Sequence, residues 1–196
     1  MTDDLDLRSG DWQVLDAFHD SKANLAFQGL KRKLGMHQET LSRALHRLES
    51  DHLVERTEDG YRLTRRGSEV LNVPLQGEST KGNKVLETYL PTDVSTHEVI
   101  SRLKYSWFST LRWLGCSEHD NEATLTWLTE DRRTQVRARF KGNRLLIELV
   151  PDSEKSNFAI KSAHELISRI IREYRSVVEP LHNSQTPAMT HESRLS

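Results

Sequence analysis

Several features are scarce or missing in this sequence of 196 residues. It contains one cysteine, so no disulfide can form within the chain, and such usage is typical of a reducing compartment. It contains no long apolar run, and its first residues are acidic, which predicts neither a membrane span nor a signal peptide. We therefore expect a cytoplasmic protein that has no membrane partner.

The sequence also lacks the motifs of common catalytic sites. It has no glycine-rich phosphate loop, no G-x-S-x-G and no H-E-x-x-H. Cys116, Glu118, His119 and Asp120 lie close enough together to suggest metal ligands. Metal sites usually show paired cysteines or histidines at fixed spacing, so a polar loop after a packed thiol is the better interpretation. The sequence predicts no enzyme, no metal and no cofactor.

What the sequence does contain is a strong helical pattern over residues 37–51. Apolar residues from Met36 to Leu48 recur on one face at helical spacing, which predicts that this face packs. The opposite face carries amide, hydroxyl, imidazole and guanidinium groups, which are the groups that read base edges and phosphates. We predict that it enters the major groove of double-stranded DNA and contacts it through Gln38, Glu39, Thr40, Ser42, Arg43, His46 and Arg47.

The flanking segments complete a winged helix-turn-helix. A short amphipathic stretch ends at Gly35, a residue suited to the left-handed end of a helix, so it predicts the helix that precedes the turn. Residues 54–63 alternate around Glu58-Asp59-Gly60 and predict a hairpin, the wing. We expect the wing to meet phosphate or the minor groove. The candidate contacts outside the recognition helix are Arg62, Lys31 and Arg32.

With these residues in view, residues 10–72 resemble the winged-helix regulators of the MarR, ArsR and PadR families of bacteria and archaea. The resemblance lies in L-G-M from Leu34, T-L-S-R from Thr40, the L-V-E-R run ending at Arg56 and G-Y-R-L-T-R-R-G from Gly60. The sequence departs from the family pattern at His37, where a serine-type cap is usual, and at His52, where a glycine is usual. The resemblance implies a sequence-specific transcription regulator of a prokaryote or archaeon.

The distribution of charge favours DNA over the alternative, a winged helix used for protein docking within a larger assembly. Residues 22–66 hold ten basic and six acidic residues, a net charge of +4. The first twenty residues hold six aspartates and one arginine, so the overall charge of −1 conceals a local asymmetry. A basic segment of this kind suits contact with phosphate and predicts binding that weakens with salt.

The rest of the chain predicts a second, α+β domain. Residues 1–9 form an acidic tail, 73–83 a linker rich in structure-breaking residues, and 180–196 a disordered tail. Between them, residues 84–179 predict the order β-α-β-β-β-α, an antiparallel sheet with helices on one face. The other face, with Arg137 and Arg139, is expected to be solvated or, less favoured, a second nucleic-acid surface.

A helix expected over residues 96–114 suggests how this domain acts. Its apolar stripe is complete without Tyr105 and Trp113, which are expected on its back. Large aromatic residues outside a core face usually mark a partner surface or a ligand pocket. We expect a homodimer, because winged-helix regulators commonly read two half-sites with two-fold symmetry. A pocket for a small-molecule effector is the alternative.

Overall fold

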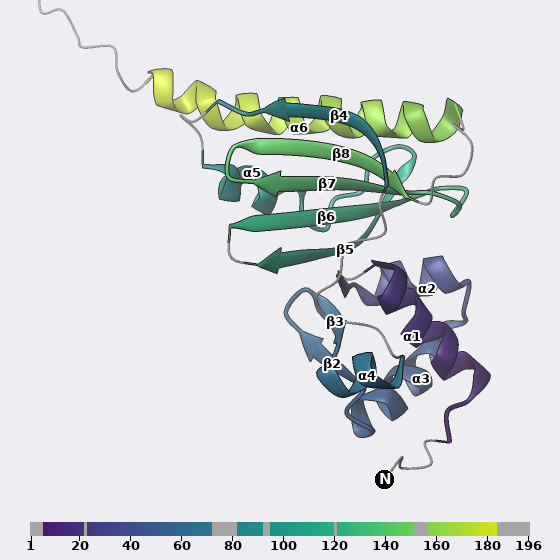
Figure 1. Cartoon of the computed structure of the whole chain (residues 1–196). Helices are drawn as coiled ribbons and strands as arrows, with labels where there is room; N and C mark the ends of the chain where they lie inside the picture. The colour runs from purple at the N-terminus through teal and green to yellow at the C-terminus, as the bar shows by residue number, and fades with distance from the viewer. Residues whose placement is uncertain are drawn as a thin grey trace, which may run out of the picture.

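A computed structural model describes residues 6–21, 23–71, 82–91, 95–119, 121–150 and 157–183. The protein is α+β, as the sequence predicts: a helical N-terminal unit is followed by an antiparallel sheet and a long C-terminal helix (Figure 1). The predicted linker and C-terminal tail lie largely outside the described residues. The last helix continues to Asn183.

The N-terminal unit has the predicted order of a winged helix. Gly35 ends the second helix in the left-handed conformation with φ of 64°, and His52 follows the third helix with φ of 56°. Thr64 caps the fourth helix, its hydroxyl accepting a hydrogen bond from the amide of Gly67. In chain order the elements are α1 (Ser9–Ser21), β1 (Asn24–Leu25), α2 (Phe27–Leu34), α3 (Gln38–Ser50), β2 (Val54–Thr57), β3 (Gly60–Leu63) and α4 (Arg65–Val70).

The C-terminal unit has one strand more than predicted. The helix expected over residues 96–114 is wrong beyond Leu103: the chain turns there and enters a strand at Leu111. A register shift between Trp113 and Gly115 interrupts the alternation of that strand, so the sequence imitates helical spacing. The elements are β4 (Asn83–Tyr89), α5 (Thr96–Leu103), β5 (Leu111–His119), β6 (Glu122–Thr129), β7 (Gln135–Lys141), β8 (Arg144–Val150) and α6 (Asn157–Asn183).

One sheet joins the two units. Its strand order is β2-β3-β1-β5-β6-β7-β8-β4, and β1 pairs with the wing strand β3 on one side and with β5 on the other. The junction is tight at Gly115, where an added Cβ would lie 1.9 Å from the carbonyl oxygen of Asn24. The two backbones therefore approach as closely as they do because Gly115 has no side chain.

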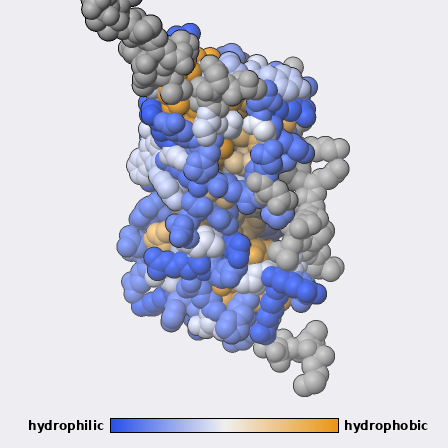
Figure 2. Space-filling view, turned by 90° about the vertical axis from the view of Figure 1, so that its left-hand side faces the viewer, coloured by the Kyte–Doolittle hydropathy of each residue, from blue (hydrophilic) through white to orange (hydrophobic). Residues whose placement is uncertain are grey.

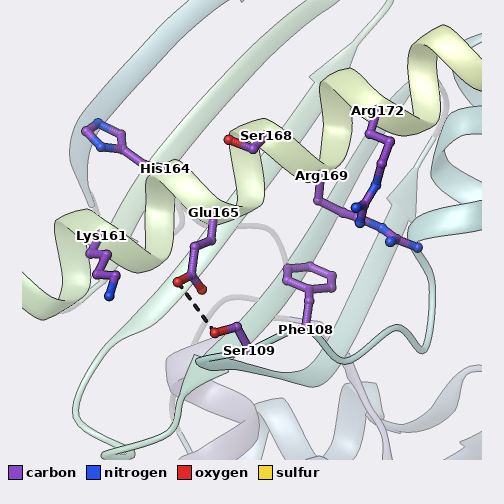
Figure 3. A pocket seen from close by; sticks show the side chains of 8 residues that line it. All are labelled: Phe108, Ser109, Lys161, His164, Glu165, Ser168, Arg169 and Arg172. Atoms are coloured by element: carbon purple, nitrogen blue, oxygen red, sulfur yellow. Dashed lines mark hydrogen bonds between the residues drawn. The ribbon is translucent and has the colours of Figure 1, made fainter.

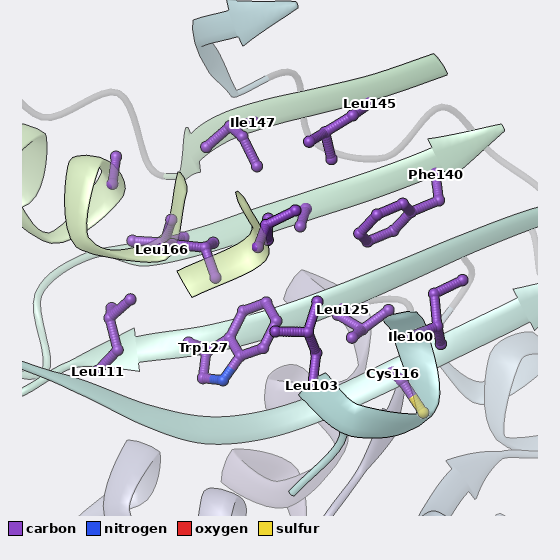
Figure 4. Close-up of a cluster of buried hydrophobic side chains, with 14 of the residues drawn as sticks. Ile100, Leu103, Leu111, Cys116, Leu125, Trp127, Phe140, Leu145, Ile147 and Leu166 are labelled. Carbon is purple, nitrogen blue, oxygen red and sulfur yellow. The ribbon is translucent and has the colours of Figure 1, made fainter. Parts of the chain in front are cut away.

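Two apolar clusters stabilise the fold. The larger one lies between the sheet on one side and α5 and α6 on the other, and it includes Trp127 and Phe140 (Figure 4). Both helices therefore cover the same face of the sheet. The smaller cluster fills the winged helix and includes Leu45 of α3. Leu114 of β5 belongs to this smaller cluster although its neighbour Trp113 belongs to the larger one. β5 is thus part of both cores.

The opposite face of the sheet is not the solvated polar face that the sequence favoured. Thr126, Gln135 and Arg137 are buried, whereas Lys141 at the end of β7 is exposed. Arg139 is half-buried and its guanidinium lies 3.3 Å from the carboxylate of Glu148 on β8. Charged groups pair across neighbouring strands here, and most of these polar residues are buried or half-buried rather than solvated.

Candidate nucleic-acid interface

The polar face of α3 is free of the protein core. Gln38, Glu39, Thr40, Ser42, Arg43 and His46 are exposed, as predicted. The apolar face is buried, and Leu41 and Leu48 have no exposed surface. The helix ends near His52, whose left-handed backbone turns the chain into the wing. The amphipathic pattern therefore presents a row of polar side chains to the outside, on a helix whose other face is held by the core.

Arg43 lies in the middle of this exposed row. Its guanidinium forms an ion pair with Glu39, one helical turn earlier, and both side chains are largely exposed, at 72% and 67%. An exposed pair of this kind contributes little to stability, because water screens it and both side chains lose freedom. The guanidinium can therefore exchange Glu39 for an external acceptor at low cost.

Arg47, also predicted to contact DNA, has an internal partner. Its Nη2 lies 2.6 Å and its Nε 3.2 Å from the two carboxylate oxygens of Asp11 on α1. Asp11 is 1% exposed and also accepts a hydrogen bond from the backbone amide of Arg8. The bidentate bond to Asp11 raises the pKa of Arg47. Arg47 thus holds α3 against α1, and its role as a DNA contact stays a prediction.

The tip of the wing lies against the C-terminal unit. The hydroxyl of Tyr105 donates a hydrogen bond of 2.6 Å to Asp59, and the ammonium of Lys104 lies 3.4 Å from the same carboxylate. Lys104 also pairs with Glu118 at 2.7 Å. The hairpin turn between β2 and β3 is acidic and held in place. Arg62, farther from the tip, is exposed and pairs with Glu55 on the neighbouring strand.

These contacts shift the pKa values of the groups involved. Burial alone would raise the pKa of Asp59, but the hydrogen bond from Tyr105 and the charge of Lys104 lower it below its ordinary value. The same hydrogen bond raises the pKa of Tyr105 to about 12. Burial alone would lower the pKa of Lys104, and the carboxylates of Glu118 and Asp59 outweigh it and raise that pKa. All three groups keep their paired forms at neutral pH.

The two candidates at the end of α2 are half-buried. The guanidinium of Arg32 lies 3.9 Å from the ring centroid of Trp107, a cation–π contact between the two units, and Arg112 lies 5.9 Å from the same ring. Burial lowers the pKa of Arg32, and the nearby charges of Arg112 and Arg132 lower it further. Lys31 is the other candidate, and its contact with phosphate stays a prediction.

The expectation that Tyr105 and Trp113 lie together on the back of a helix is wrong, because α5 ends at Leu103. Trp113 lies in β5, is 3% exposed and packs edge-on against Trp127, so it offers no surface to a partner. Tyr105 is 53% exposed and follows the helix with φ of 59°. The two rings do contact each other, with centroids 5.6 Å apart. The sequence pattern did not predict the loop of residues 104–110, which contacts the winged helix through Asp59 and Arg32.

The thiol considered as a metal ligand is buried. Cys116 has no exposed surface, and burial, together with the neighbouring carboxylate of Asp59, raises its pKa to about 12. The nearby Glu118 pairs with Lys104 instead. No group of three or more metal-ligating side chains occurs in the part of the chain that the structure describes.

The described residues on the face with the wing and α5 form no wide apolar area (Figure 2). Figure 2 shows this face as largely hydrophilic, with apolar side chains in separate patches. Within the described ranges, no helix is both long and apolar enough to cross a membrane.

The comparisons with known proteins agree with the N-terminal assignment at a coarse level. A family model described as the N-terminal domain of methanogenesis regulatory protein FilR1 matches residues 13–73, close to the predicted limits of 10–72. A search among curated proteins finds no relative that matches the chain. Residues 13–73 are therefore similar to the N-terminal domain of a regulatory protein.

Proposed function

We propose that this protein is a sequence-specific DNA-binding transcription regulator that reads the major groove with the exposed face of α3. The observation that carries the proposal is the row of exposed polar side chains on a helix whose opposite face is anchored in the core. The similarity of residues 13–73 to a regulatory protein's N-terminal domain supports it. Membership of the MarR, ArsR and PadR group remains part of the proposal, and the proposed activity is binding rather than catalysis.

Within this proposal, the role of each residue on and around α3 depends on whether it already has a partner within the protein. Gln38, Ser42 and Arg43 are exposed and read base edges, with Arg43 placed for a guanine edge or a phosphate. Arg47 positions α3 through Asp11. The acidic tip of the wing is held by the C-terminal unit, so the wing contributes through Arg62 on the side of the hairpin rather than through its turn.

Binding at two salt concentrations to selected and random duplexes tests the proposal. Duplexes selected from a random pool by the full chain should bind at least 1,000-fold more tightly than random duplexes, which is at the low end for specific regulators. Both affinities should fall as salt increases, because phosphate contacts release counterions. A protein-docking module, the alternative function, would select no duplex and would show no specificity ratio.

We further propose that the regulator is a homodimer assembled through its C-terminal unit, so that two α3 helices read two half-sites. Tyr89 on the edge strand β4 is 67% exposed and Ile171 on α6 is 46% exposed, and these apolar side chains support the choice of this unit. Sedimentation equilibrium on the full chain at micromolar concentration measures the state directly. A monomer under these conditions would contradict the dimer and leave the proposal of DNA binding intact.

A further inference from the structure

A cleft of about 330 Å³ opens between α6 and the loop that precedes β5. Six side chains of α6 form one wall, and Phe108 and Ser109 form the other (Figure 3). Lys161, Arg169 and Arg172 give the α6 wall a cationic character. The proposed DNA-binding face lies on α3, in the other unit, so this cleft has no part in it.

The acidic side chain in the cleft is already engaged. Glu165 accepts a hydrogen bond of 2.7 Å from the hydroxyl of Thr110 and a longer one, 3.5 Å, from Ser109. Arg169 pairs through Nη2 with Glu173 at 2.8 Å, while its buried Nε has no hydrogen-bond partner among the described residues. Arg172 is exposed, and no ion pair holds it within the same residues. The cleft therefore has cationic donors in excess of the acceptors that could satisfy them.

The cleft also has an apolar side. Phe108 is held against Trp127, with ring centroids 5.6 Å apart, and faces the cleft from the loop. Figure 3 shows the guanidinium groups of Arg169 and Arg172 on the side of α6 that faces the Phe108 ring. An apolar ring beside guanidinium groups suits a molecule that has an apolar body and an anionic head.

The loop on the far side of the cleft connects it to the winged helix. Tyr105 bonds to Asp59 in the wing, and Trp107 stacks on Arg32 of α2. Two residues of this loop, Tyr105 and Ser109, have positive φ, at 59° and 39°, which costs free energy for residues other than glycine. A molecule that moves Phe108 or Ser109 therefore acts on a strained segment that contacts the wing and α2.

We propose that this cleft binds an amphipathic organic anion, a carboxylate or phosphate ester with an apolar body, and that the loop of residues 104–110 transmits its binding to the winged helix. The binding step is independent of DNA. Only the consequence for regulation rests on the proposed function.

Anilinonaphthalene sulfonate, an aromatic anion with a fluorescence that reports binding, tests the site on the full chain. Arg172→Gln should weaken its binding about fivefold, the loss of one partly screened charge contact. Arg175→Gln, an exposed arginine of α6 that does not line the cleft, should leave it unchanged. Uncharged anilinonaphthalene should bind both variants equally. Equal affinities of the two variants for the anion would overturn the site.

Competition then defines the head group. Octanoate or octyl phosphate should displace the bound probe, and octanol at the same concentration should not. Displacement by octanoate assigns a carboxylate ligand, and displacement by octyl phosphate alone assigns a phosphate ester. Equal displacement by octanol would show that the apolar wall alone binds the probe and would overturn the anionic class.

Hydrogen exchange tests the transmission without any DNA. With the probe saturating, amide exchange in Gly60–Leu63 should change at least twofold in the wild type, because the exchange rate depends exponentially on the free energy of local opening. The same amides should respond less in Arg172→Gln than in the wild type at a probe concentration near the wild-type dissociation constant, because the weaker variant is then occupied to a smaller extent. Unchanged exchange in the saturated wild type would overturn the coupling, and it would leave the proposed DNA binding untouched.

Discussion

Substitution of Arg47 distinguishes a residue that contacts DNA from a residue that only positions the DNA-reading helix. Arg47→Met keeps the length of the side chain and removes both hydrogen bonds to Asp11. The carboxylate of Asp11 is 1% exposed, so it is left buried without its countercharge. We therefore expect the variant to lose stability first and DNA affinity only as a consequence.

The magnitude follows from the burial of the two groups. Removing one partner of a fully buried ion pair costs about 3–5 kcal/mol. Arg47 is 33% exposed, so solvent screens part of the interaction, and about 2–3 kcal/mol is the appropriate estimate. With a denaturant dependence of about 2–3 kcal/mol per molar, the urea midpoint should fall by about 1 M.

Urea unfolding followed by circular dichroism measures this shift. Adding Asp11→Asn to Arg47→Met should recover part of the loss, because the buried charge is then removed. Arg43→Ala should leave the midpoint unchanged, since its ion pair is exposed. An unchanged midpoint in Arg47→Met together with weakened DNA binding would contradict the positioning role and return Arg47 to the reading surface.

Four further substitutions test the junction, the pH response and the wing. Gly115→Ala should cost about 1–3 kcal/mol by forcing β1 away from β5. Gly10→Ala should instead raise the thermal midpoint, because its added Cβ makes only an ordinary contact of 3.8 Å with Met36 and alanine favours a helix more than glycine does. The pKa of Tyr105 is raised to about 12 from an ordinary 10.0. Its contribution to stability is therefore complete below pH 10 and is lost as the pH rises toward 12. Tyr105→Phe should flatten this part of the dependence of stability on pH, measured by urea unfolding. Arg62→Ala should weaken binding to all duplexes similarly and reduce the slope of the salt dependence by about one in anisotropy titrations; altered sequence preference with an unchanged slope would contradict this.

The winged helix could be predicted from the sequence because its signals are local. Gly35 marks the turn, the spacing from Leu41 to Leu48 gives the buried face of α3, and Thr64 caps α4. Each of these signals depends on residues within a few positions along the chain. The exposure of Arg43 follows from the same periodicity, because a helix with one buried face presents the other to solvent.

The junction between the two units could not be predicted, because it depends on contacts far apart in the sequence. Leu111 and Leu114 have the spacing of a helix, but a β-bulge places Leu114 in the core of the winged helix. Nothing near Arg47 in the sequence indicates that Asp11 takes its guanidinium. The same holds for Asp59, whose partners lie in the loop after α5. Contacts between residues far apart in the sequence decided which of the predicted polar residues stay exposed for contact with DNA.

The reading of DNA by the exposed face of α3 is tested most directly by Arg43→Ala against a duplex selected by the wild-type chain. Fluorescence anisotropy should show a loss of about 1–3 kcal/mol for the selected duplex and a much smaller change for random duplex. Arg102→Ala is the matched control, because Arg102 also pairs with a glutamate one turn away but lies on α5, and it should bind as the wild type does. Equal binding of the selected duplex by Arg43→Ala and the wild type would contradict the account.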